Sequence, residues 1–320
     1  MTLFGEIRSA CRRVADLARH VRIVAENVEP YAAALPLDQV FAPSLDPAHH
    51  YQGTPEKTLA YVLTVDAVNF GSGFFPHLRK RPGLSGYLTV ASSLKDWFDA
   101  RDAVRAEDLA SLTASDCIRI FGQLEGAPEP VHELMRLFAE ALNDLGRFTI
   151  EHYQGGFASL IEDARHSAEA LVGILDRIPF YRDVHFYGHL RVPFYKRAQI
   201  TAADLSVAFA NQGWGRFDDL ASLTIFADNL VPHVLRMDGL LRYEPDLLDR
   251  INREEPLTPG SAEEIEIRAC GLTAVESLVE ALRRRGLDVI ARDLDYFLWN
   301  RGQRPEYKAH PRHRARCVYY

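Results

Sequence analysis

The sequence predicts a mainly α-helical protein, a single compact helical body with a few short strands. Two observations lead to this fold class. Apolar residues recur at steps of three and four along much of the 320-residue chain, which is the periodicity of amphipathic helices. Segments with the composition of strands are few and short. We therefore expect one domain over residues 1–320, with a division into two lobes, about 1–180 and 181–320, as an option.

Five stretches carry the helical pattern: 3–27, 53–68, 130–150, 156–178 and 272–286. The second has Thr54 as a plausible N-cap and Pro55 at the first helical position, and both residue types favour helix starts. The fifth ends in three arginines and a glycine, a pattern that suits the negative end of the helix dipole and the C-cap.

Strand signals come from two stretches. Residues 185–195 are aromatic-rich and contain Gly188 and Pro193, so they predict a short hairpin or an extended connector. Residues 315–320, "ARCVYY", predict a short edge strand. Glycine- and proline-containing segments at 125–130 and 254–261 indicate loops.

Composition and charge exclude several classes of protein. Hydrophobic residues make up 47% and charged residues 25%, with a net charge of −7. That balance argues against a protein that coats nucleic acid or an anionic membrane, because such surfaces favour basic proteins. The sequence shows no signal peptide and no long apolar run. Its four cysteines are scattered and form no C-x-x-C pair. We expect a cytoplasmic protein with no metal site and no cofactor.

Common nucleotide and metal motifs are incomplete in this chain. The segment "NFGSGFFP" has Gly71 and Gly73 but lacks the third glycine of a dinucleotide-binding loop. The pair His132-Glu133 has Arg136 where a metalloprotease helix needs its second histidine. No phosphate-binding loop of the G-x-x-x-x-G-K-[ST] type occurs.

Asp228 stands out because an apolar run, residues 223–227, ends abruptly at it. It could cap a helix that starts near Leu230, with Pro232 in the first turn. It could also be a carboxylate in an apolar pocket, which needs a partner to stay ionised. The two interpretations are compatible. Lys196 in "PFYKRAQI" could supply that partner, as one of five lysines against 32 arginines, or it could simply extend to water.

Residues upstream of Asp228 suggest a helix–hairpin–helix-like unit. Thr201 could cap a first helix, Gly213-Trp214-Gly215 could form a turn, and a second helical segment would lead to Asp228. DNA base-excision glycosylases of the helix–hairpin–helix class have a comparable order of hairpin and catalytic aspartate, which is an analogy at the level of the fold alone.

Several aromatic residues could stack on a purine-like base, although at least half of them are expected in the core: Phe70, Phe74, Phe75, Tyr296, Phe297 and Trp299. Asp295 could accept hydrogen bonds from a guanine-like edge. Its alternatives are a helix cap or an ion pair with Arg301.

Five motifs together resemble the queuosine salvage protein family: "NFGSGFFP", "FYKRAQI", "LTIFADNLVPHVLR", "EIRACG" and "DYFLW". The resemblance runs in order from His49 to the C-terminus. It implies a fold similar to helix–hairpin–helix DNA glycosylases and an enzyme that hydrolyses the N-glycosidic bond of queuosine 5′-monophosphate. The product is the 7-deazaguanine base queuine, for salvage into tRNA. By the same resemblance Asp228 is the catalytic aspartate and Lys196 the active-site lysine.

Nine further residues are predicted to bind substrate: His49, Phe70, Gly71, Ser72, Arg197, Asn229, His233, Asp295 and Trp299. Asp228 would stabilise the oxocarbenium-like sugar or attack it, and Arg197, His49 or His233 would hold the phosphate or the base. We expect a monomer with a small-molecule substrate and no nucleic-acid polymer or membrane as partner. Two alternatives stay open, a DNA or RNA base-excision glycosylase and a non-catalytic binder of a modified nucleobase.

Overall fold

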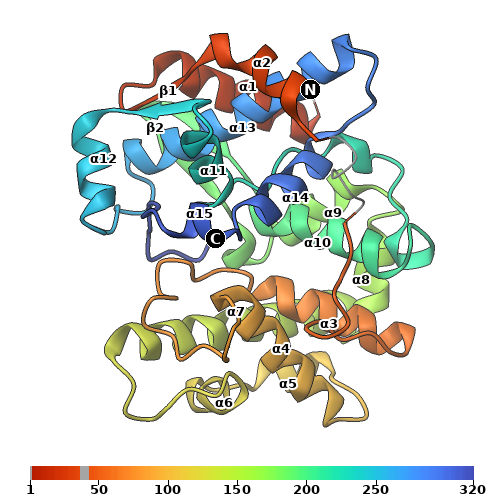
Figure 1. Cartoon of the computed structure of the whole chain (residues 1–320). Helices are drawn as coiled ribbons and strands as arrows, with labels where there is room; N and C mark the ends of the chain where they lie inside the picture. The colour runs from red at the N-terminus through yellow and green to blue at the C-terminus, as the bar shows by residue number, and fades with distance from the viewer. Residues whose placement is uncertain (1, 37–42) are drawn as a thin grey trace. The chain divides into compact units, whose positions relative to one another are not determined.

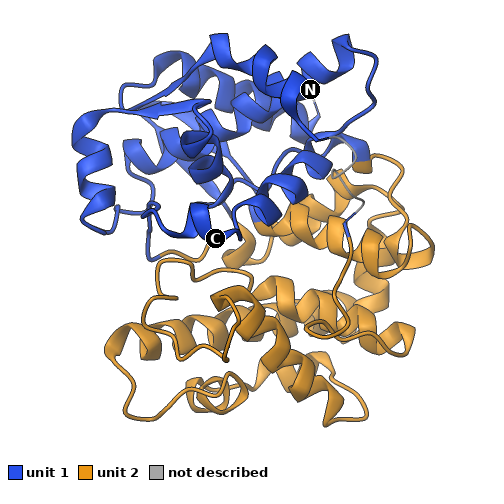
Figure 2. Ribbon diagram, in the orientation of Figure 1, with its two compact units in different colours: residues 1–43, 183–196, 221–316 blue, residues 44–182, 197–220, 317–320 orange. Residues whose placement is uncertain are grey.

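The computed structural model describes residues 2–36 and 43–320 and is mainly helical (Figure 1). The chain divides into two compact units (Figure 2). Unit 1 comprises residues 1–43, 183–196 and 221–316, and unit 2 comprises residues 44–182, 197–220 and 317–320. Each unit therefore draws on separate stretches of the sequence. The boundary at residue 196 falls inside helix α10, Lys196–Ala208.

Unit 1 contains seven described α-helices and two antiparallel strand pairs. The helices are α1 (Leu3–Leu17), α2 (Val28–Ala34), α11 (Val231–Met237), α12 (Pro245–Asn252), α13 (Ala262–Arg284), α14 (Ala291–Arg301) and α15 (Pro305–Lys308). The strands are β1 (Val21–Ile23), paired with β4 (Leu241–Tyr243), and β2 (Val184–Tyr187), paired with β3 (Leu190–Pro193).

Helix α13 is the centre of unit 1, and α1, α2, α11, α14 and β1 all pack against it. It is buried on every side from Glu264 to Val275. This stretch nevertheless carries two glutamates and Arg268, and charged groups so far from water need hydrogen-bonding partners. Glu266 and Arg268 consequently tie α13 to other segments of the unit, whereas Glu264 accepts a hydrogen bond from Gly260 N directly before the helix at 3.2 Å.

Helix α1 ends at Leu17, so the prediction of one helix over residues 3–27 is wrong beyond that point. One carboxylate oxygen of Glu266 accepts hydrogen bonds from the backbone N–H groups of Arg19, His20 and Val21, at 3.1, 2.6 and 3.0 Å. These bonds take the N–H groups that a longer helix would use. The chain turns into β1 instead, and Val21 pairs with Tyr243 of β4.

The hairpin predicted at 185–195 is confirmed, since β2 and β3 are antiparallel and Gly188 takes a left-handed φ of 59° between them. The predicted edge strand at 315–320 is wrong, because these residues form no strand. The main-chain oxygen of Tyr320 instead accepts hydrogen bonds from the backbone N–H groups of Gly71 and Ser72, within unit 2.

Unit 2 is built around α7 (Glu129–Tyr153), against which α3, α5, α6 and α8 pack. Its other helices are α3 (Pro55–Ala67), α4 (Gly86–Asp99), α5 (Ala106–Ala110), α6 (Ala114–Ile120), α8 (Phe157–Asp163), α9 (Ala168–Leu175) and nearly all of α10. Gly146 allows α7 to approach α5 closely, because a Cβ atom there would lie 2.5 Å from the carbonyl oxygen of Ala106 in α5. The helices predicted at 53–68 and 130–150 are confirmed as α3 and α7.

Residues 156–178 form two helices, α8 and α9, and not the single helix that the sequence predicts. The chain breaks at Arg165 and His166, which have φ of 49° and 62°. Asp219 stabilises the new start, since its carboxylate accepts hydrogen bonds from Ala168 N at 2.6 Å and from Ser167 Oγ at 2.9 Å. The apolar periodicity continues through the break, but the carboxylate of Asp219, distant in the sequence, stabilises the N-terminus of a second helix.

The predicted details of the hairpin unit before Asp228 are also corrected. Thr201 does not cap α10, which begins at Lys196, and the Thr201 hydroxyl donates to Arg197 O inside the helix at 3.0 Å. The turn at Gly213–Gly215 is present as one 3₁₀ turn. The second helical segment is reduced to another 3₁₀ turn, Leu220–Ser222.

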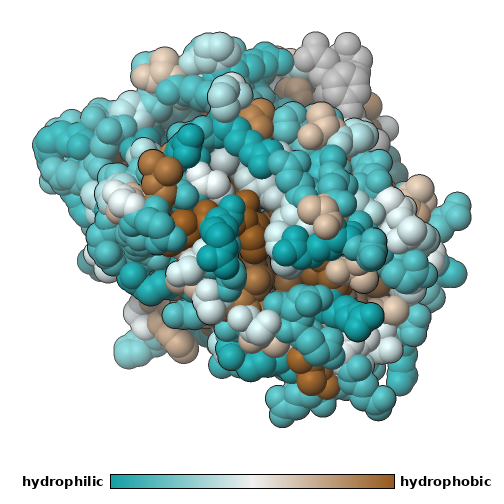
Figure 3. Space-filling view, turned by 90° about the horizontal axis from the view of Figure 1, so that it is seen from below, coloured by the Kyte–Doolittle hydropathy of each residue, from teal (hydrophilic) through white to brown (hydrophobic). Residues whose placement is uncertain are grey.

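Hydrophilic residues cover most of the face shown in Figure 3. Four large apolar side chains are well exposed among the described residues: Leu17, Leu124, Ile150 and Phe186. No described helix combines the length and the apolar character needed to cross a membrane.

Candidate active site

Asp228 ends the irregular segment that leads into α11, and its side chain bonds the backbone at the start of this helix. Its Oδ1 accepts hydrogen bonds from Leu230 N at 2.8 Å and Val231 N at 3.0 Å. The side chain is half-buried. Both capping bonds use the same oxygen, so the other oxygen, Oδ2, is left for a further partner. The two interpretations of Asp228 from the sequence, cap and pocket carboxylate, are therefore compatible in one conformation.

Asp295 of α14 is an acid that interacts electrostatically with Asp228. It is 5% exposed, and its Oδ1 accepts a hydrogen bond from Phe226 N at 2.9 Å. Burial raises the pKa of Asp295 well above its usual range, and the negative charge of Asp228 raises it further. The Phe226 hydrogen bond and the positive charge of Lys196 oppose this shift. Burial thus favours the protonated form of Asp295 at a pH where an ordinary aspartate is ionised.

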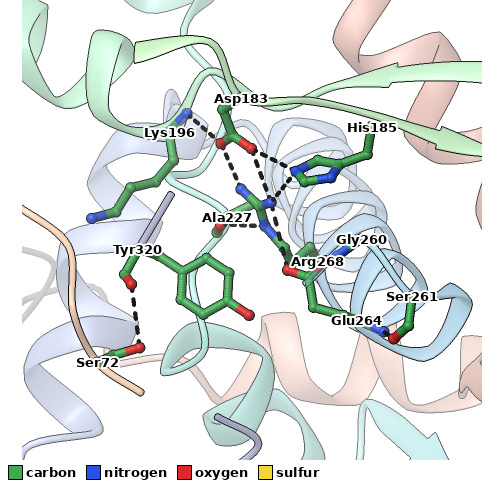
Figure 4. A network of polar contacts seen from close by, with 10 residues as sticks. All are labelled: Ser72, Asp183, His185, Lys196, Ala227, Gly260, Ser261, Glu264, Arg268 and Tyr320. Atoms are coloured by element: carbon green, nitrogen blue, oxygen red, sulfur yellow. Dashed lines mark hydrogen bonds and ion pairs between the residues drawn. The ribbon is translucent and has the colours of Figure 1, made fainter. Parts of the chain in front are cut away.

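Lys196 is the first residue of α10 and is 5% exposed. Its backbone N–H donates to Oδ2 of Asp183 at 3.2 Å, and in Figure 4 its ammonium group extends away from that carboxylate. The preceding Tyr195 has a φ of 49°, a left-handed conformation that is costly for a bulky residue. Lys196 acts electrostatically on Asp295, and its direct pairing with Asp228 stays a prediction.

Arg312 brings a second cation toward Asp228. The Asn229 side chain donates from Nδ2 to His313 O at 3.0 Å, which ties the segment after α15 to the residue that follows Asp228. Burial lowers the pKa of Arg312, and the negative charge of Asp228 partly restores it. Its Nε is buried without a hydrogen-bond partner among the described residues. A buried donor in this condition is costly and favours binding of an acceptor.

His233 and Trp299 are the remaining predicted residues in unit 1. His233 is 1% exposed, with its Nε2 2.9 Å from Tyr307 O and its Nδ1 3.3 Å from Arg236 Nη2. Burial lowers the pKa of His233 to about 4, so the ring is neutral and holds α11 to α15. Trp299 lies one helical turn after Asp295 on α14 and is half-buried.

The other five predicted residues belong to unit 2, where packing accounts for much of their surroundings: His49, Phe70, Gly71, Ser72 and Arg197. The Phe70 ring packs edge-on against Phe138, with the ring centres 5.1 Å apart. Arg197 lies over the Phe70 ring at 4.9 Å and donates to Ala67 O at 2.6 Å. His49 Nδ1 lies 2.7 Å from Asp46 Oδ2. Substrate contacts of these five residues stay predictions.

A buried network that the sequence did not predict supports the loop before Asp228 (Figure 4). Arg268 of α13 donates from Nε to Ala227 O at 2.9 Å. Its two terminal nitrogens, Nη1 and Nη2, donate to Oδ1 and Oδ2 of Asp183, at 3.0 and 2.6 Å. Arg268 is completely buried, and Asp183 is 2% exposed. Burial raises the pKa of Asp183, but Arg268 and the hydrogen bonds outweigh burial and bring it well below the usual range.

Comparison with known proteins shows to which family this chain belongs. The model of the family described as "Queuosine salvage protein" matches residues 49–320. This chain belongs to the queuosine salvage protein family. A protein of Sphaerobacter thermophilus named "Queuosine 5′-phosphate N-glycosylase/hydrolase" is 38% identical over 319 residues, 98% of this chain and 97% of the relative. A mouse protein of the same name is 31% identical over 338 residues, 98% of each chain, and one from Dictyostelium discoideum is 32% identical over 83% of this chain and 79% of the relative.

Two signals in this queuosine salvage family member could have pointed to the missed residues. An arginine in the otherwise apolar "EIRACG" of a helix must find partners inside the protein. Asp183 likewise precedes a predicted hairpin, at a turn position where carboxylates bind backbone N–H groups. Neither signal names the partner, because 85 residues separate Arg268 from Asp183.

Proposed function

We propose that this chain hydrolyses the N-glycosidic bond of queuosine 5′-monophosphate and releases queuine for salvage into tRNA. The family membership and the names of the relatives support this activity. One observation in the chain itself supports the proposal. Asp228 uses one of its two carboxylate oxygens to bond the start of α11, and its negative charge acts on a buried acid, Asp295. Two carboxyl groups in unlike environments are the usual arrangement for separate acid and stabilising roles.

Asp228 acts on the sugar in this proposal. When the bond between C1′ and the base nitrogen breaks, positive charge develops on C1′ and the ring oxygen. A carboxylate beneath that carbon stabilises the charge or bonds to it briefly. The hydrogen bonds from Leu230 N and Val231 N hold the Asp228 carboxyl group in place before substrate binds, so little reorganisation is needed during the reaction.

Asp295 acts on the departing base. The electron pair of the broken bond leaves with the base, so the base must gain a proton. A deazapurine has carbon at position 7 and cannot be protonated there as a purine is. Asp295 in its protonated form donates that proton at another position, a role that replaces the hydrogen-bond acceptor predicted from the sequence. Water then adds to C1′ and returns a proton to the site, which gives ribose 5-phosphate.

In this proposal, positively charged side chains of unit 1 hold the 5′-phosphate of the substrate. Lys196 and Arg312 are the candidates, because both act on the carboxyl pair electrostatically and Arg312 has a buried Nε without a described partner. A few local cations suffice for a small anionic substrate, so the net charge of −7 is no obstacle.

The direct test is to incubate the purified protein with queuosine 5′-monophosphate and to measure free queuine by mass spectrometry. We expect release by the wild type and none by Asp228→Asn at equal protein concentration. Asparagine caps helices as well as aspartate does, so the variant should keep the thermal midpoint. Wild-type turnover by Asp228→Asn would remove Asp228 from the chemistry.

Two alternatives make different predictions. A DNA or RNA base-excision glycosylase should bind oligonucleotides with a steep dependence on salt, because phosphate contacts release counterions. A binder of a modified nucleobase should retain the nucleotide intact. We favour hydrolysis of the free nucleotide over both, on the net charge of −7 and the family membership.

The remaining expectations from the sequence accompany this proposal. We propose that the chain works as one domain and as a monomer in the cytoplasm, without a nucleic-acid polymer as partner. We also propose a fold related to helix–hairpin–helix DNA glycosylases, which is supported by the order of α10, the turn at residues 213–215 and Asp228.

A further inference from the structure

Arg268 is in an unusual place for an arginine. It lies in the middle of α13, with no exposed surface, and its guanidinium stacks 4.0 Å from the centre of the Phe194 ring. All three of its nitrogens donate hydrogen bonds, Nε to Ala227 O and the other two to Asp183. A planar fork with donors on two edges can serve two acceptors at fixed angles, which a lysine cannot do.

The two acceptors of Arg268 lie in the two segments that carry the proposed catalytic residues. Ala227 directly precedes Asp228. Asp183 holds the start of α10, because its Oδ2 accepts from Lys196 N at 3.2 Å and its main-chain oxygen accepts from Phe194 N at 2.9 Å. An unbroken series of hydrogen bonds therefore runs from the carbonyl before Asp228, through Arg268 and Asp183, to the backbone of Lys196 (Figure 4).

The carboxylate of Asp183 has a full set of partners. His185 Nε2 lies 3.1 Å from Asp183 Oδ1, and the Arg268 guanidinium bridges both carboxylate oxygens. Glu264, one helical turn before Arg268, adds a weaker ion pair to the guanidinium at 3.6 Å. The groups bound to Asp183 restrict rotation of its side chain, so the backbone N–H of Lys196 meets an acceptor in a fixed position.

Stability alone is a weak reason for such a pair. Removing two charges from water is expensive, and apolar residues of similar size often stabilise a protein as much or more. A buried pair can instead specify the geometry of the segments it joins, and here those segments are the ones before Asp228 and Lys196.

We propose that the buried Arg268–Asp183 pair positions Asp228 and Lys196 relative to each other, so that Arg268 and Asp183 are positioning residues for the hydrolysis. This inference rests on the function proposed above. Neither residue touches the substrate, and both act through the backbone of the residue they hold. A displacement of about 1 Å of a reacting group can lower the rate about 100-fold.

The test compares Arg268→Lys and Asp183→Asn with Glu266→Gln. Arg268→Lys keeps a positive charge beside Asp183 but lacks the fork that reaches Ala227 O. Asp183→Asn keeps an acceptor for Lys196 N but loses the charge. Glu266 is the matched control, because it is equally buried on the same helix but bonds neither the residue before Asp228 nor Asp183 or Lys196. Its carboxylate accepts hydrogen bonds from the backbone of residues 19–21 and from the Tyr187 hydroxyl of β2 at 2.8 Å.

We expect both pair variants to lower kcat for queuosine 5′-monophosphate by about 10–100-fold while KM changes less than about threefold. Assays run well below the thermal midpoint of each protein, and Glu266→Gln should keep near-wild-type kcat despite a lower midpoint. The double variant Arg268→Lys/Asp183→Asn should lose no more kcat than the worse single variant, because the two residues act as one unit.

Two outcomes overturn the positioning role. In the first, the pair variants match Glu266→Gln in kcat once all are assayed below their midpoints. In the second, the losses in kcat multiply in the double variant. A failure of the proposed function is separate, since it appears as a wild type that releases no queuine.

Discussion

Replacing Asp295 by asparagine changes one carboxyl oxygen for an amide nitrogen at a buried position and removes one titrating group. The raised pKa of Asp295 means that the folded state holds a proton that the unfolded state has already lost. Stability from this group is fully present below the pKa of an unfolded aspartate. It is lost as the pH rises through the raised pKa of the folded state.

The size of the effect follows from linkage. Between the two pKa values the folded state binds one more proton, so the free energy of unfolding falls by about 1.4 kcal/mol for each pH unit. The amide that Asp295→Asn introduces can still accept the hydrogen bond from Phe226 N through its carbonyl oxygen. The free energy of unfolding of Asp295→Asn should therefore rise relative to that of the wild type by about 1.4 kcal/mol for each pH unit.

Urea unfolding of both proteins at half-unit steps from pH 5 to pH 9 measures this difference. Titrating groups other than Asp295 are common to both proteins, so their contributions cancel in the difference between the two curves. Parallel curves of unfolding free energy against pH would refute the claim that Asp295 is a protonated buried acid. The same variant should lower kcat by about 10²–10⁴-fold if Asp295 is the general acid.

The other predictions concern α11 and its surroundings. Asp228→Asn should abolish queuine release and change the unfolding free energy by less than about 0.5 kcal/mol, because asparagine is an equally good cap; a large loss of stability in urea would contradict this reasoning. Gly271→Ala should destabilise by about 1–3 kcal/mol, since the new Cβ would lie 2.9 Å from Pro232 Cγ, and an unchanged thermal midpoint would count against that contact. His233, with a pKa lowered to about 4, should make stability fall as the pH drops from about 6.5 to 4, by roughly 3 kcal/mol in total. His233→Gln should make the free energy of unfolding fall less steeply over this pH range. A fall as steep as in the wild type would show that another group causes it.

Sequence patterns predicted the elements whose causes are local. Helix α3 begins after Thr54 with Pro55 in its first turn, and α7 follows a clear apolar face, so both agree with prediction. The hairpin at 185–195 depends on Gly188, which can adopt the left-handed φ of the turn. In each case the residues that determine the structure lie within the element or directly beside it.

Predictions failed where a distant side chain competes with the local pattern. Glu266 captures the N–H groups after Leu17 and ends α1 early. Asp219 starts a new helix at Ala168 in the middle of an apolar repeat. Neither carboxylate is near its target in the sequence, and periodicity holds no information about such partners.

The residues of the candidate site show the same difference between local and distant causes. Asp228 could be chosen because an apolar run ends at it, and its capping role follows from the next three residues. The protonation of Asp295 depends on burial and on the charge of Asp228, which only the folded chain brings together. Arg268, Asp183 and Arg312 were missed because their contacts join segments far apart in the sequence.

Helix α13 contacts several neighbouring segments through side chains that point in different directions around its axis. Glu266 holds the turn into β1, Arg268 holds the loop before Asp228, and Gly271 makes room for Pro232. One residue inserted after Ser261 would rotate all of these side chains by about 100°. A single insertion there would disconnect three regions at once, so a change in the length of this helix should be more damaging than any single substitution considered above.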